Sequence, residues 1–118
     1  MDKLSKINGL NYKISELRKT NDELQRALGI ANSLISSLNS LVADVNKVHD
    51  DLKNSFIIGG SPPDNDMLVG SVVPDIKNIL SELTTSMIPE INREIKENNQ
   101  IISNYQYEIS RINSEEEA

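Results

Sequence analysis

The sequence predicts an all-α fold, in which a single domain forms a long antiparallel two-helix hairpin resembling a coiled coil. Three observations predict it. In both halves of the 118-residue chain, apolar residues recur at alternating spacings of three and four residues, the heptad pattern of a helix that buries one stripe. A segment rich in Gly, Pro and Asp separates the halves. Aromatic residues make up only 3% of the chain, which favours a thin seam of Ile, Leu and Val over a thick core.

The first helix is expected over about residues 3–57. Its apolar stripe persists over about seven heptads, which a strand pattern cannot imitate. Two polar residues, Asn21 and His49, interrupt the stripe. Its members fall into two sets, the first being Ile7, Ile14, Leu28, Ile35, Val42 and Phe56 and the second Leu10, Leu17, Leu24, Ala31, Leu38, Val45 and Leu52.

A turn is expected over about residues 58–66. Two consecutive glycines supply the positive φ angle that commonly ends a helix, and two prolines prevent the helix from resuming. Asp64 or Asp66 would then cap the next helix by accepting its free N–H groups. The residues assigned to the turn are Phe56, which closes the first stripe, and Gly59, Gly60, Pro62 and Pro63.

The same segment does not match a ligand-binding loop. If Asp64 took the first position of a calcium loop, Val69 would stand where Gly is required and Asp75 where a bidentate Glu is required. The two glycines also lack the strand before them and the Gly-Lys-Ser/Thr after them that a phosphate-binding loop needs. The sequence therefore predicts no metal and no cofactor here.

The second helix is expected over about residues 67–113, followed by a frayed acidic tail over 114–118. Its stripe shifts by one residue partway along, where Pro89 lies, and a proline inside a helix predicts a kink or local unwinding. Asn98 interrupts this stripe. Before the shift the stripe contains Val73, Ile76, Leu80, Leu83 and Met87, and after it Ile88, Ile91, Ile95, Ile102, Tyr105, Ile109 and Ile112.

The charges of the chain argue against nucleic-acid binding and support the pairing of the two predicted helices. The net charge of −6 argues against nucleic-acid binding, which needs clustered Lys and Arg. Residues 1–26 carry six basic and four acidic side chains, whereas residues 90–118 carry three basic and seven acidic ones. A hairpin would bring these two ends together. Because His49 is the only histidine and Cys is absent, no catalytic or metal-ligating set is predicted, and we expect no enzyme.

The two asparagines in the stripes have two interpretations. A buried Asn in a coiled-coil seam costs stability and fixes register or partner choice. Alternatively, Asn21 and Asn98 mark a thin, hydrated part of the hairpin. With the turn centred near residue 63, the sequence places Asn21 opposite Tyr105 and Asn98 opposite Leu28, to within about one helical turn.

Both helices carry a second apolar stripe near the turn. A hairpin buries one seam on each helix, so a further stripe predicts a surface that binds another helical protein. Residues from Ala27 to Ala43 carry no charge at all. A fully packed hairpin with a few exposed leucines is the alternative. The predicted partner-binding residues are Ile30, Leu34, Leu41, Val48, Leu68, Val72 and Ile79.

The chain resembles a known family in its opening LSKINGLNYKISELRKTNDELQRAL and its closing EINREIKENNQIISNYQYEISRIN. These segments look like the small Trp-X-Gly proteins of Gram-positive type VII secretion, and more closely like the YwqH-like and LXG-toxin-associated helical proteins. The resemblance implies an accessory, targeting factor or chaperone that binds the N-terminal helical domain of an LXG toxin, together with a second small helical accessory. The Trp-X-Gly bend is missing, as is the C-terminal Tyr-x-x-x-Asp/Glu signal, since Ile109 follows Tyr105 and Arg111 follows Tyr107 at that spacing.

The sequence therefore gives a leading function and one alternative. The first is a non-enzymatic accessory that is cytoplasmic or exported together with its partner. The second is a structural coiled-coil protein that assembles with itself, as in a phage or a cell envelope. No signal peptide or membrane span is expected, because the uncharged run from Ala27 to Ala43 is shorter than a span and rich in Ser and Asn.

Overall fold

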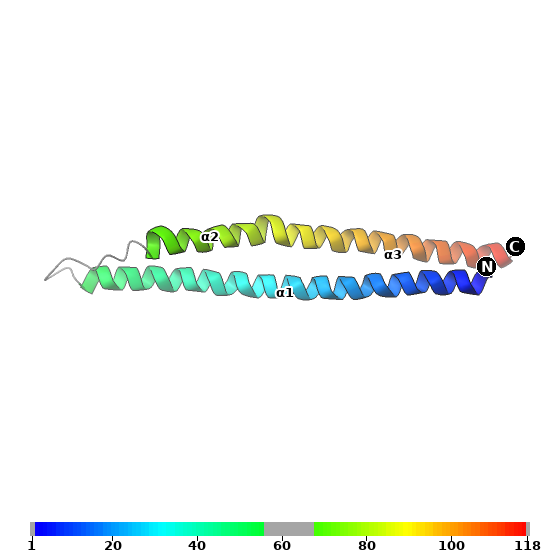
Figure 1. The fold of residues 1–118 in the computed structure, drawn as a ribbon, viewed down its shortest axis with the longest axis horizontal. Helices are drawn as coiled ribbons and strands as arrows, with labels where there is room; N and C mark the ends of the chain where they lie inside the picture. The colour runs from blue at the N-terminus through cyan, green and yellow to red at the C-terminus, as the bar shows by residue number, and fades with distance from the viewer. Residues whose placement is uncertain (1, 56–67, 118) are drawn as a thin grey trace. The chain divides into compact units, whose positions relative to one another are not determined.

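The computed structural model describes residues 2–55 and 68–117, and every one of them except Asp2 is helical. The first helix, α1, spans Lys3–Ser55. The remaining elements, drawn in Figure 1, are the π-helical turn η1 (Leu68–Val72), α2 (Val73–Glu82), the π-helical turn η2 (Leu83–Met87) and α3 (Ile88–Glu117). The all-α class predicted from the heptads is confirmed.

Asp2 caps the start of α1. The backbone N–H of Ser5 donates a hydrogen bond of 2.7 Å to Asp2 Oδ1, and the N–H of Lys6 donates one of 3.3 Å to the Asp2 carbonyl oxygen. A side-chain oxygen that accepts from the first helical turn satisfies a donor that has no partner within the helix. The hydrogen bond from Ser5 lowers the pKa of Asp2.

Contacts between Cα atoms divide the chain into two compact units. Unit 1 consists of Met1–Leu28 and Pro89–Ala118, and unit 2 consists of Gly29–Ile88. Helix α1 contributes residues to both units, α3 lies almost wholly in unit 1, and α2 lies in unit 2.

In unit 1 the first part of α1 packs along α3. Ile14 and Ile102 are the buried residues, with 5% and 7% of their surface exposed. The ammonium group of Lys13 lies 5.6 Å from the centre of the Tyr105 ring. Asn21, further along α1, bonds to Asn99, which comes earlier in α3, so later residues of one segment meet earlier residues of the other.

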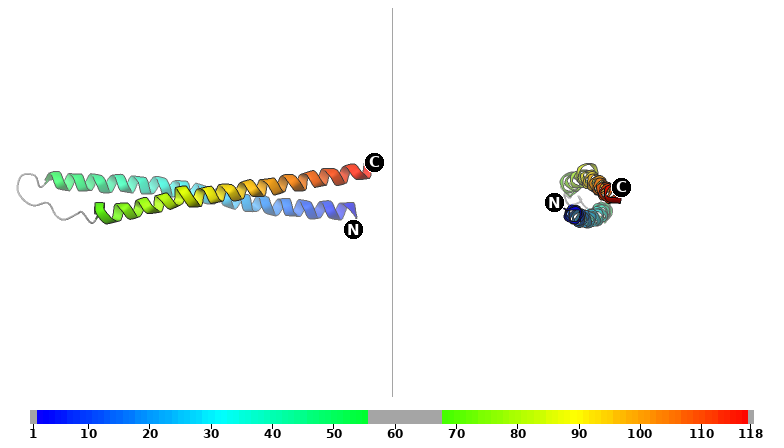
Figure 2. Two further views of the ribbon diagram at one scale, coloured as in Figure 1. Left: turned by 90° about the horizontal axis from the view of Figure 1, so that it is seen from above. Right: turned by 90° about the vertical axis from the view of Figure 1, so that its right-hand side faces the viewer.

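In unit 2 the second part of α1 and α2 lie side by side in both views of Figures 1 and 2. Ala31 on α1 is 4% exposed, and three residues of the later elements are equally well covered: Val73, Ile76 and Leu83, at 5–7%. No described side chain in either unit is fully buried. The core is therefore a thin seam, as the low aromatic content suggested.

Burial follows the predicted heptads closely. Every residue of the two stripes on α1 that lies in the described part of the chain is buried or half-buried, including Asn21 and His49. On the later elements the same holds for the stripe from Val73 to Ile112, with one exception. Met87 is 52% exposed, so its assignment to the buried stripe was wrong.

The turn η2 accounts for both the shift and the exposure of Met87. A π-helical turn accommodates one extra residue, because its hydrogen bonds reach five residues back instead of four. Within η2 the N–H of Ile88 bonds to the carbonyl oxygen of Leu83. Leu83 and the next buried residue of its set, Ile91, are consequently eight residues apart instead of seven. The extra residue keeps both on the packed side and moves Met87 outward.

Two threonines and a proline favour the π-helical turn. The hydroxyl of Thr84 donates to the carbonyl oxygen of Leu80 at 2.9 Å, and that of Thr85 donates to Ser81 at 2.6 Å. Such bonds provide donors for carbonyl groups where the regular ladder is disturbed. Pro89 has no N–H to offer, and its ring would clash with the carbonyl group four residues earlier in a regular helix. The local unwinding thus comes before the proline, over Leu83–Met87.

The predicted ends of the helices differ slightly from the observed ones. Helix α3 continues to Glu117, past the expected end near residue 113, and Arg111 pairs with Glu115 at 3.9 Å in its last turns. The turn residues Phe56, Gly59, Gly60, Pro62 and Pro63, and the caps at Asp64 or Asp66, all lie outside the described residues.

Candidate interaction surface

Exposed apolar side chains gather at one heptad position of unit 2. In each heptad we name a the buried residue that is followed by the second buried residue, d, three positions later. The g position is the residue immediately before a, at the edge of the buried seam. In most helices that pack in pairs this position is polar. In unit 2 it is apolar, and we call the set the g face: Leu34, Leu41 and Val48 on α1, with Val72, Ile79 and Met87 on the later elements.

The side chains of the g face are partly open to solvent. Their exposed fractions run from 38% for Val72 to 52% for Met87. Each residue is thus covered on its seam side and open on the other. Large apolar side chains that recur at one heptad position and remain half-exposed are typical of a surface that another protein covers.

Unit 1 has different side chains at the same heptad position. Lys6 and Lys13 occupy it on α1, and Glu94 and Glu108 occupy it on α3. The apolar exceptions are Ala27, which is half-buried, and Ile101, which is 39% exposed. The charged residues make this side of unit 1 a solvated surface. The apolar character of the g position therefore belongs to unit 2.

The structure places five predicted partner-binding residues together on the g face: Leu34, Leu41, Val48, Val72 and Ile79. Ile30 is 69% exposed and lies one helical turn before Leu34, at the next position round the helix. Leu68 is the first residue of η1, and its side chain lies outside the description. Met87, which the sequence pattern placed in both the buried stripe and the second apolar stripe, lies on the g face and is 52% exposed.

The two seam asparagines form one polar layer in unit 1. Asn21 donates from Nδ2 to Asn99 Oδ1 at 3.0 Å, and Asn98 donates from Nδ2 to Asn21 Oδ1 at 3.0 Å. Asn21 and Asn98 are both half-buried. The prediction that Asn21 faces Tyr105 was wrong by one heptad, since Asn21 contacts Asn98. Asn99 was missed because it lies outside the stripe.

His49 occupies a seam position near the end of α1. It is half-buried, and its Nδ1 atom is covered without a hydrogen-bond partner. Across residues 2–55 and 68–117, no group of three or more His, Cys, Asp or Glu side chains could hold a metal ion. His49 therefore has no ligating neighbours in the described part of the chain.

Unit 1 contains a shallow groove. It has a volume of about 250 Å³, and its lining residues are Ser5, Lys6, Gly9, Leu10, Lys13, Glu108 and Ile112. Its charged side chains include no histidine and no pair of carboxylates.

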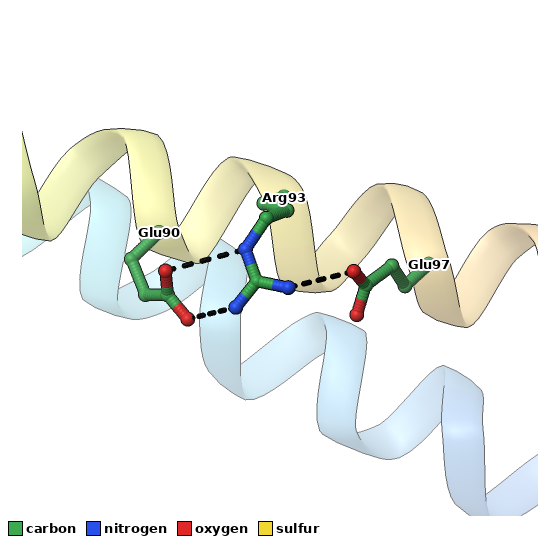
Figure 3. Close-up of polar contacts among 3 residues, drawn as sticks. All are labelled: Glu90, Arg93 and Glu97. Carbon is green, nitrogen blue, oxygen red and sulfur yellow. Dashed lines mark hydrogen bonds and ion pairs between the residues drawn. The ribbon is translucent and has the colours of Figure 1, made fainter.

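The start of α3 carries an exposed ion-pair cluster. Arg93 donates to Glu90 in the preceding turn and to Glu97 in the following turn, as Figure 3 shows, and the latter bond measures 2.6 Å. The hydrogen bonds that Arg93 donates to Glu90 and, to a smaller extent, to Glu97 raise the pKa of Arg93. All three side chains are more than half exposed, so the cluster supports the surface of the helix and offers no site.

By length and composition, α1 contains one stretch apolar enough to be a candidate membrane span, and 6% of that stretch is buried. The sequence had predicted no span. The same composition suits a helix whose apolar side binds another protein, and the g face supplies such a side.

Comparison with protein-family models, with curated proteins and with solved structures finds no match to this chain. The function must therefore be inferred from the chain's own residues.

Proposed function

We propose that this protein is a non-enzymatic interaction module that binds a helical partner through the g face. The chain would form a long antiparallel helical hairpin, kinked near Pro89. The order of contacts in unit 1 supports this arrangement, because Lys13 meets Tyr105 while Asn21, further along α1, meets Asn98. The colours of Figure 1 also run in opposite directions along the two segments of each unit.

A single observation carries the binding proposal. Six large apolar side chains of unit 2 share the g position and are 38–52% exposed. In an antiparallel pair, the g positions of both helices lie on the same side of the seam, because reversing one helix reverses its sense of rotation. The six side chains then form one continuous apolar surface, of the kind that a third helix covers in a bundle.

The biological role that we propose follows the resemblance to type VII proteins. The module would serve as a targeting factor or chaperone for the N-terminal helical domain of an LXG-type toxin, in the cytoplasm or exported together with it. A helical partner of this class would present an amphipathic stripe to the g face. The alternative is a structural protein in which a second copy of the chain covers the g face.

Co-purification tests the first role. The chain would be co-expressed with the N-terminal helical domain of an LXG toxin, and Leu34→Asp/Leu41→Asp would be compared with the unaltered protein. We expect the double variant to lose the partner and to keep its helicity by circular dichroism, since both side chains are already half-exposed.

A matched control uses exposed apolar residues outside the g face of unit 2. Tyr12 is 67% exposed and Ile101 is 39% exposed, both in unit 1, so Tyr12→Asp/Ile101→Asp should retain the partner. Unchanged co-purification of Leu34→Asp/Leu41→Asp would refute the proposal. A stable dimer of the purified chain, measured by light scattering, would favour the structural alternative.

A further inference from the structure

We propose that the partner of the g face is an amphipathic helix whose apolar stripe is flanked by Lys and Arg, and not a second copy of this chain. The inference rests on the proposed function, which supplies the g face as the docking surface. It adds the chemistry of the occupant. The observation behind it is the charge of the residues that border the g face.

Five of the six residues that stand three positions after a g-face residue are acidic, and the exception is Ser37 after Leu34. Side chains three positions apart in a helix are neighbours on one side. Asp44 stands three positions after Leu41, Asp75 three after Val72, and Glu82 three after Ile79. Asp51 holds the same position after Val48. We call Asp44, Asp75 and Glu82 the acidic rim.

The acidic rim is available to a partner. All three side chains are exposed, and no ion pair within the described residues engages them. The lysines of unit 2 occupy other heptad positions: Lys47 lies further round the outside of α1, and Lys53 and Lys77 lie immediately after the d position, on the opposite side of the seam. The g face is therefore an apolar strip with negative borders.

The negative charge of the acidic rim distinguishes the two candidate occupants of the g face, a basic amphipathic helix and a second copy of this chain. Two copies placed face to face would bring acidic rims together, and like charges across an interface disfavour association. The whole chain also carries a net charge of −6, which adds repulsion between copies. A helix with basic borders would gain ion pairs at the rim while its apolar stripe covers the g face. This is the same logic by which charges that flank a coiled-coil seam select partners.

Binding of two designed peptides to the full chain tests the inference. Both peptides are four heptads long and share one Leu/Ile stripe, but the positions beside the stripe are Lys in one and Glu in the other. Fluorescence anisotropy at low salt should show the Lys peptide binding about tenfold tighter than the Glu peptide, the order expected when three exposed charge pairs turn from repulsive to attractive. Salt at 0.5 M should reduce the difference.

The matched variant is Asp44→Lys/Asp75→Lys/Glu82→Lys. It leaves the g face unaltered and should reverse the preference, so that the Glu peptide binds more tightly. The variant Leu34→Asp/Leu41→Asp should bind neither peptide. Circular dichroism of each variant checks that the helices are retained.

Three outcomes would overturn the inference, and they are distinguishable. Equal binding of both peptides would leave the g face as a helix-binding surface and remove the role of the acidic rim. Absence of binding to either peptide would remove the proposed function as well. A dimer of the purified chain that Leu34→Asp/Leu41→Asp dissociates would show that the occupant is a second copy.

Discussion

Deleting one residue of η2 tests whether this π-helical turn exists to keep the buried stripe in register. Along the second half of the chain the buried residues are seven apart, except across η2, where Leu83 and Ile91 are eight apart. Removing Ser86 makes the spacing seven throughout. The deletion is best made with Pro89→Ala, because a proline inside the resulting regular α-helix would cost about 3 kcal/mol.

A second deletion of an exposed serine provides the comparison. Removing Ser103 from α3 rotates everything after it by about 100°, which moves Tyr105, Ile109 and Ile112 out of the seam. All three are half-buried. Complete burial of such a side chain contributes about 1.5–3 kcal/mol, so the loss is about 1 kcal/mol for each and about 3 kcal/mol in total. Removing Ser86 should change the unfolding free energy by less than about 1 kcal/mol.

Thermal unfolding followed by circular dichroism measures the difference. In the Pro89→Ala background, the Ser103 deletion should lower Tm by roughly 10 °C, while the Ser86 deletion should remain close to Pro89→Ala itself. If both deletions lower Tm equally, the extra residue of η2 does not set the register.

Two further predictions concern unit 1. Asn21→Leu/Asn98→Leu should raise the unfolding free energy by about 1 kcal/mol, because half-buried amides are replaced by apolar side chains, and spin-label distances between α1 and α3 should broaden as the register becomes less specific. The hydrogen bond from the N–H of Ser5 lowers the pKa of Asp2 in the folded chain. The ionised carboxylate therefore stabilises the folded state fully above the unfolded pKa of about 4, and this stabilisation is lost as pH falls through the lower pKa of the folded state. The protection factor of the Ser5 amide against hydrogen exchange should fall as pH decreases through that range, and in Asp2→Ala it should be low at every pH.

The buried stripes could be predicted from the sequence because a heptad pattern over this length has one physical solution. Residues such as Ile14 and Ile102 recur at the helical period, so they face one side whatever the partner is. Met87 shows the limit of this reasoning. It lies four residues after Leu83, a spacing that fits an α-helix, and only the extra residue in η2 turns it outward.

The pairing of the asparagines depends on information that local spacing does not contain. The residue that faces Asn21 is set by the length of the connection and by the residue inserted in η2, and an error in either moves the contact by whole turns. A seam Asn in each helix could have indicated a mutual layer, because two amides satisfy each other better than an amide satisfies a Tyr ring or a Leu. Asn99 could then be expected as the neighbour that completes it.

The acidic rim has more influence on partner choice than the apolar area of the g face. Covering six half-exposed side chains contributes about 6 kcal/mol, at about 1 kcal/mol for each. The loss of translational and rotational freedom on association costs about 4–15 kcal/mol, which offsets most or all of that gain. Any amphipathic helix offers the same apolar contribution, whereas Asp44, Asp75 and Glu82 favour a basic border and oppose an acidic one. Specificity therefore depends on the three carboxylates, and the apolar side chains determine how strongly a helix of either charge is held.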